Sequence, residues 1–133
     1  MPNALENLCK AIAYPDPVPE GAAAFQLRVD GGRVEARLMG SRLVLSRGIT
    51  RAEDDLPKLA GYAAGRLLKE EAVLAWDDGA AECILWQECP ANASGAQLVR
   101  FFENFMASCD WWLARLANLN APPVLSPEMV IMP

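Results

Sequence analysis

The sequence predicts one α+β domain in which helices cover an antiparallel sheet, an α-β-β-β-α-β-β-α sandwich. Two observations predict this class. The spacing of apolar residues changes along the chain between the helical period of 3.6 and the strand period of 2, and short glycine-containing turns separate the alternating runs. The chain has 133 residues, of which 53% are hydrophobic and 22% charged, and this is the size and composition of a single globular domain.

The N-terminal part of the chain predicts a short helix followed by three strands. Apolar residues recur at helical spacing over residues 3–13, and the prolines at positions 15, 17 and 19 end this pattern because proline removes a backbone donor. Alternation then predicts strands over 25–29 and 34–38 with a turn at Gly31-Gly32, and a third strand over 42–47 after Gly40-Ser41. The apolar positions are Leu5, Leu8, Cys9 and Ile12 in the helix, and Phe25, Leu27, Val29, Val34, Ala36, Leu38, Leu43 and Leu45 in the strands.

A second helix is predicted from Asp54 and Asp55, which are suitable capping residues, to about Lys69. Its centre contains Gly61 and Gly65, and a glycine inside a helix costs about 1 kcal/mol relative to alanine. Close packing of another element against these glycines would offset this cost in helix stability. Two candidates for that element stay open: the chain's own sheet, and a second helix across an interface.

The C-terminal part predicts two more strands and a long helix. Strands over 72–76 and 82–89 are joined through Asp77-Asp78-Gly79. Ser94 and Gln97 have capping-box spacing and open a helix that runs to about residue 118.

The hairpin at 72–89 is apolar on both of its faces. By residue parity we expect one face to carry Trp76, Ile84 and Trp86 and the other to carry Cys83, Leu85 and Cys89. A strand of this kind is buried on both faces, or one of its faces meets a partner.

The composition excludes several classes of function. The chain has no histidine, which excludes a histidine base, a histidine triad and histidine metal ligands. Its net charge of −5 argues against nucleic-acid binding, which depends on clustered lysine and arginine. No phosphate-binding or hydrolase motif is present. An enzyme is therefore the weakest of the hypotheses, and we expect no catalytic residue and no cofactor.

The cysteines and the N-terminus predict a reduced, cytoplasmic protein. Cys9, Cys83, Cys89 and Cys109 lie in apolar patterns without the closely spaced pairs that zinc requires, so we expect no metal site. The N-terminus does not resemble a signal peptide, and no apolar run approaches the length needed for insertion into a membrane.

The chain contains more apolar residues than a small sheet and three helices need for a core. Residues 1–120 account for the domain, and residues 121–133 form a proline-containing apolar tail with no further element to support it. This surplus predicts association with a second copy, with another protein, or with both.

Three local features extend this interpretation. They are the strand–Gly-Gly–strand pattern over 25–38, the passage from helix to hairpin over 65–76, and the closing helix that ends Trp112-Leu113-Ala114-Arg115-Leu116. With the small size, the acidity and the element order, they resemble the class I chaperones of type III secretion (the Tir chaperone-like family), which bind and deliver effector proteins. The resemblance spans residues 3–119.

The resemblance implies a homodimeric chaperone that binds the extended N-terminal segment of a secreted effector and keeps it competent for export. Strand addition and insertion of effector side chains into apolar grooves would hold the segment. Net negative charge would keep such a carrier soluble and could complement basic effector segments. The expected partner-binding residues are Leu5, Leu8, Ile12, Phe25, Leu27 and Val29, and the expected dimer interface contains Leu59, Tyr62, Ala63, Arg66, Leu74 and Trp76.

Two alternatives stay open at this point. The first is a regulatory or heterodimeric partner with the same fold. The second is a small ligand-binding domain or enzyme with a pocket beneath the long helix.

Overall fold

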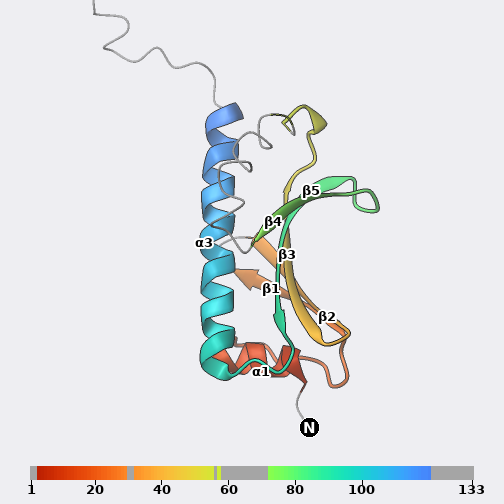
Figure 1. The fold of residues 1–133 in the computed structure, drawn as a ribbon, viewed down its shortest axis with the longest axis vertical. Coiled ribbons are helices and arrows are strands. Elements are labelled where there is room, and N and C mark those ends of the chain that lie inside the picture. The colour runs from red at the N-terminus through yellow and green to blue at the C-terminus, as the bar shows by residue number, and fades with distance from the viewer. Residues whose placement is uncertain (1–2, 30–31, 56, 58–71, 121–133) are drawn as a thin grey trace, which may run out of the picture.

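The computed structural model describes residues 3–29, 32–55, 57 and 72–120 (Figure 1). Most of the predicted helix from Asp54 to about Lys69 lies outside these residues, as do Leu59, Tyr62, Ala63 and Arg66 of the predicted dimer interface and the tail at 121–133. The described elements are α1 (Ala4–Ala11), β1 (Ala24–Val29), β2 (Gly32–Met39), β3 (Arg42–Thr50), the 3-10 turn η1 (Glu53–Asp55), β4 (Val73–Asp77), β5 (Glu82–Pro90) and α3 (Gly95–Asn120).

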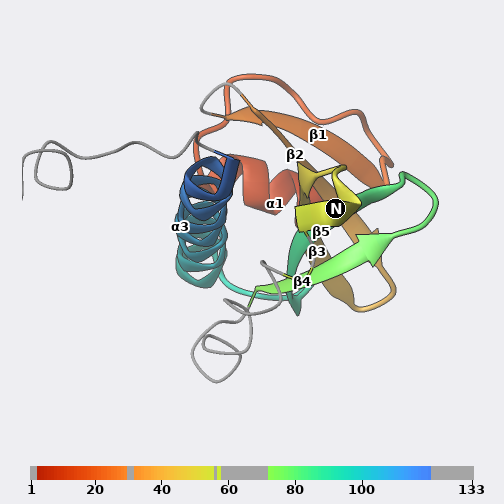
Figure 2. The same ribbon diagram turned by 90° about the horizontal axis from the view of Figure 1, so that it is seen from above.

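The predicted α+β class is confirmed. The strands form one five-stranded antiparallel sheet in the order β1-β2-β3-β5-β4, so β1 and β4 are its edge strands. Figure 1 shows α3 running along one side of this sheet, and Figure 2 shows α1 on that same side. We call the side covered by α1 and α3 the covered face, and the opposite side the open face, because no described helix lies on it.

Both described helices begin at the caps that their sequences provide. The Asn3 side chain accepts a hydrogen bond from the Glu6 N–H at 3.0 Å, and its amide donates to the Ala22 carbonyl at 3.1 Å. At α3 the predicted capping box is confirmed. The Ser94 N–H donates to Gln97 Oε1 at 2.8 Å, and the Gln97 N–H donates to Ser94 Oγ at 3.2 Å.

The sheet register confirms that the three predicted strands at 25–29, 34–38 and 42–47 follow one another through turns, with one correction. Met39 pairs with Arg42 across the Gly40-Ser41 turn, where Gly40 has the positive φ of +60° that a tight turn requires. Gly32, however, already pairs with Val29 and therefore belongs to β2 rather than to the turn.

The assignment of Trp76 to the face of Ile84 and Trp86 is wrong. Trp76 pairs with Cys83 in the β4–β5 ladder, so its side chain lies on the covered face. Ile84 pairs with Ala75 and Trp86 pairs with Val73 on the open face. Residue numbers show which side chains share a face within one strand, but between two strands this depends on the pairing register. Four residues separate Asp77 from Glu82, so even-numbered residues of β4 pair with odd-numbered residues of β5.

The core lies between the covered face and the two helices. Its fully buried side chains come from every layer: Leu5 and Leu8 from α1, Leu27, Val34, Leu43, Leu45 and Leu85 from the sheet, and Leu98, Phe105 and Cys109 from α3. The buried polar residues among those described are Asp55, Gln87 and Ser108.

Candidate partner-binding surfaces

The first predicted surface, on α1 and β1, divides into buried and accessible residues. Leu5, Leu8 and Leu27 have no exposed surface, so their side chains pack inside the protomer. Ile12, Phe25 and Val29 are half-buried at the margin of the same core. The accessible part of this surface therefore comes from the end of α1 and from the edge strand β1.

A turn after α1 brings Tyr14 to the edge of β1. Ala13 has a left-handed φ of 55°, and the Tyr14 N–H donates to the Cys9 carbonyl at 2.8 Å, which ends the helix in a Schellman-type turn. The Tyr14 ring then packs edge-to-face on Phe25 with the ring centroids 5.9 Å apart. Its hydroxyl accepts a hydrogen bond of 2.9 Å from the Arg28 N–H. The sequence carries no local pattern that predicts this contact.

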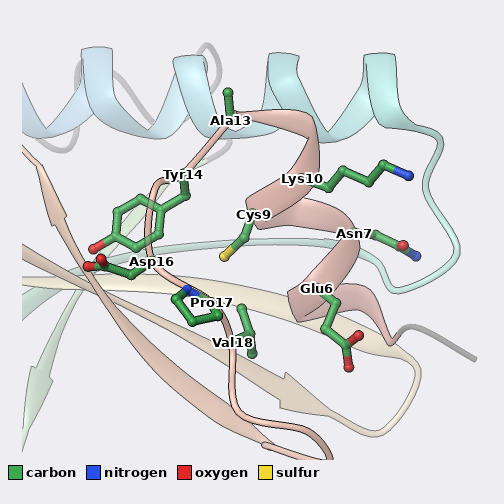
Figure 3. A pocket seen from close by; sticks show the side chains of 9 residues that line it. All are labelled: Glu6, Asn7, Cys9, Lys10, Ala13, Tyr14, Asp16, Pro17 and Val18. Carbon is green, nitrogen blue, oxygen red and sulfur yellow. The ribbon is translucent and has the colours of Figure 1, made fainter.

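A hollow of about 410 Å³ lies between α1 and the segment that follows it (Figure 3). Tyr14 lines one end, so the hollow and the β1 edge meet at this residue. The apolar part of the lining includes Val18 and the buried Cys9, whereas the rim is polar. The lining residues are Glu6, Asn7, Cys9, Lys10, Ala13, Tyr14, Asp16, Pro17 and Val18.

The open face of the sheet carries a second hollow, of about 500 Å³, in which Ile84 and Trp86 lie beside Val44 and Met39. Met39 is 56% exposed and joins Val44, Ile84 and Trp86 in a contiguous apolar patch. Ion pairs border these residues: Arg37 with Glu35 at 2.9 Å, and Arg42 with Glu88 at 2.9 Å. The sequence left open whether the face of Ile84 and Trp86 is buried or meets a partner, and it did not indicate Met39 or Val44.

Leu74 and Trp76 are the two residues of the predicted dimer interface that the structure describes. Both lie on edge strand β4, where they are half-buried and pack against the core next to Leu85 and Cys83. They lie at the opposite edge of the sheet from β1.

The thiols are in environments that oppose ionisation. Burial raises the pKa of all four, and for Cys109 the increase to about 11 persists although Arg47 acts in the opposite direction. A thiol is a poor nucleophile when its pKa is raised. Within the described part of the chain no group of three or more histidine, cysteine or acidic side chains could hold a metal ion. None of the described helices has the length and hydropathy needed to cross a bilayer.

Comparison with solved structures identifies the fold. A chain of the HopA1–SchA chaperone–effector complex superposes with a TM-score of 0.67 at 16% identity, and the match covers 84% of this chain and 91% of that one. A chain of the ExsC–ExsE complex matches with a TM-score of 0.64 at 15% identity, covering 84% and 89%. The protein has the type III secretion chaperone fold.

The chaperone fold is also found outside chaperone–effector complexes. YbjN from E. coli, described as a putative transcription regulator, matches with a TM-score of 0.60 at 15% identity over 86% of this chain and 90% of that chain. No protein-family model and no curated protein sequence matches the chain. The fold is therefore established by shape, and the function has to be argued from the surfaces.

Proposed function

We propose that the protein is a cytoplasmic, homodimeric chaperone that binds the extended N-terminal segment of a type III secretion effector and keeps it competent for export. The likeness to chains of chaperone–effector complexes carries this proposal. Two hollows and a half-buried apolar margin support it, because such surfaces are expected of a protein that holds another chain. In this proposal the protein acts by binding, without catalysis.

The edge of β1 is the proposed site for the effector. An extended segment can add to this edge as a further strand, while side chains on its covered-face side contact Ile12, Phe25 and Val29. Leu5, Leu8 and Leu27 would support these three residues from within the core. The hollow on the open face, around Trp86, offers a second contact surface for the same wrapped segment.

The homodimer is proposed to form at the other side of the sheet. Leu74 and Trp76 lie on edge strand β4 and keep some exposed surface, which favours an interface there. Leu59, Tyr62, Ala63 and Arg66 are proposed to complete it. This arrangement would leave the β1 edge of each protomer free for an effector.

A second candidate function is regulation, with this chain as the partner of a transcription regulator or of a related chain. The likeness to YbjN favours it. The likeness to a chain of the heterodimeric ExoU–SpcU complex, at a TM-score of 0.59, keeps a 1:1 assembly with another protein as an alternative to the homodimer.

Purification of the tagged chain from its native host, followed by mass spectrometry, tests these proposals. A secreted protein captured through its N-terminal segment supports the chaperone, whereas a transcription regulator as the main partner favours the second function. Light scattering on the isolated chain measures the dimer, and a monodisperse monomer at micromolar concentration contradicts it.

Two matched variants separate the surfaces. Phe25→Asp places a charge at the β1 edge, and Met39→Asp places the same charge on the open face. We expect Phe25→Asp to lose the partner, whereas Met39→Asp, at the second contact surface, should weaken binding by a smaller amount. Equal retention in both variants would contradict the β1 site.

A further inference from the structure

The free edge of β1 has one backbone N–H that is already bonded. In an antiparallel pair, successive residues point their N–H and C=O groups alternately toward and away from the neighbouring strand. The Arg28 N–H points away from β2, toward Tyr14. The N–H groups of Ala24 and Gln26, at alternate positions along the same strand, therefore also face the free edge. Within the described part of the chain, the N–H groups of Ala24 and Gln26 have no hydrogen-bond partner.

The Tyr14 hydroxyl occupies the position that a partner's backbone carbonyl would need. Its 2.9 Å bond to the Arg28 N–H has the length of a bond in a sheet ladder. One N–H cannot donate a full bond to both acceptors at once. We propose that Tyr14 guards the β1 edge, and that an incoming extended segment pairs with β1 only by displacing the Tyr14 hydroxyl from Arg28. This inference rests on the proposed function and adds the residue that controls it.

The side chains beside this edge specify the chemistry of the segment. Arg28 and Arg33 are directly opposite each other on the open-face side of β1 and β2, and both are exposed. Like charges in this position are destabilising. Neither has an ion-pair partner among the described residues, whereas the nearby Arg37 is paired with Glu35. Asp16 lines the same hollow as Tyr14, but the charged side chains on the open-face side of this edge are Arg28 and Arg33. We therefore expect the segment to carry an acidic side chain beside Arg28.

The opposite side of the segment is apolar. Side chains alternate along an extended segment, so the residues on either side of the acidic one point to the covered face. There they meet Phe25 and Val29, which are half-buried. Movement of Tyr14 away from Arg28 also opens the edge to the hollow that Tyr14 lines (Figure 3). The structure therefore assigns to this edge an extended segment in which acidic and apolar residues alternate.

Nuclear magnetic resonance on the labelled full chain tests the guard directly. Tyr14→Phe keeps the ring on Phe25 and removes only the hydroxyl. We expect faster hydrogen exchange at the Arg28 amide in this variant. A short blocked peptide of alternating glutamate and valine should shift the amides of Ala24, Gln26 and Arg28, and it should bind Tyr14→Phe roughly two- to tenfold more tightly than the unchanged chain, because one hydrogen bond no longer has to be broken.

Two controls define the site and the charge. Gln26→Pro removes an N–H that faces the free edge and leaves the β1–β2 ladder intact, because edge strands tolerate proline there; this variant should lose peptide pairing. A peptide of alternating lysine and valine has the same strand pattern with the opposite charge and should bind more weakly than the glutamate peptide.

Equal or weaker peptide binding by Tyr14→Phe, unchanged exchange at Arg28, or no shift of the three edge amides at millimolar peptide would each overturn the proposal. These outcomes are distinct from failure of the proposed function, which depends on the partner captured from the host. If an effector binds through α1 and β1 and Tyr14→Phe has no effect on that binding, the chaperone proposal stands and the proposed role of Tyr14 is wrong.

Discussion

Neighbouring residues of β3 lie in opposite environments. Leu45 has no exposed surface on the covered face, whereas Val44, the preceding residue, lines the hollow of about 500 Å³ on the open face. The same contrast runs through the sheet: Leu43 and Leu85 are buried, but Met39 and Val73 are 56% and 38% exposed. Strand alternation alone would allow polar residues on the open face. The apolar residues of the open face are half-buried or exposed, so they gain less from burial in the isolated protomer than those of the covered face, and this is why we propose the open face as a second contact surface.

The largest difference between the faces should appear in stability. Leu45→Ala removes a fully buried side chain, and we expect it to lower the free energy of unfolding by about 2–5 kcal/mol. The matched variant Val44→Ala, on the same strand, should cost less than about 1 kcal/mol because its side chain already meets solvent. Urea denaturation measures both values, and similar costs would show that the open face is covered in solution.

The buried thiols test whether the covered face is closed to solvent. The pKa of Cys109 is raised by burial from 9.0 to about 11, so at a given pH it has about 100-fold less thiolate than an exposed cysteine. We expect a thiol reagent to label Cys109 only after unfolding, as detected by mass spectrometry. Rapid labelling of Cys109 in the native protein would show that α3 does not close the covered face.

The same shift has a consequence for stability at alkaline pH. The unfolded chain releases the Cys109 proton near pH 9.0, whereas the folded chain retains it until about pH 11. Because the folded state then binds more protons, the contribution of this group to stability is complete below pH 9 and is lost as pH rises toward 11. Cys109→Ala should remove this part of the alkaline slope, and an identical slope would contradict the assignment.

A smaller effect is expected at the cap of α3, the helix that covers the core. Ser94→Ala removes the acceptor of the Gln97 N–H and should cost about 1 kcal/mol. Ser94→Asp restores an acceptor and is the matched control. Thermal unfolding monitored by circular dichroism gives the two values, and equal loss in both variants would point to a role other than capping.

The smallest effect is expected from the ion pairs of the open face. Arg42 and Glu88 are 43% and 40% exposed, so their pair should contribute only about 0.2–1 kcal/mol. A double-mutant cycle with Arg42→Gln and Glu88→Gln measures the coupling, which should fall as salt is added. A coupling energy well above this range would show that water is more excluded from the open face than the exposure of Met39 implies.

Most of the secondary structure could be predicted because its causes are local. The strands follow the alternation of apolar residues, and both described helices begin at caps formed by residues three positions apart, Asn3 with Glu6 and Ser94 with Gln97. Helix α3 ends at Asn120, close to the predicted end near residue 118. Such interactions involve neighbours in the chain, so no knowledge of the tertiary fold is needed to anticipate them.

The sequence by itself therefore determined the order of the described helices and strands and the capping box of α3. The tertiary structure decided which face each residue occupies and which groups meet across the chain. The register of the β4–β5 ladder separated Trp76 from Trp86, and the packing of α1 left Leu5, Leu8 and Leu27 without exposed surface. The bond from the Arg28 N–H to the Tyr14 hydroxyl depends on the path of the chain after α1. The physical reason is that periodicity states that a side chain is apolar, whereas only the packed elements determine whether it meets the core, the solvent or a partner.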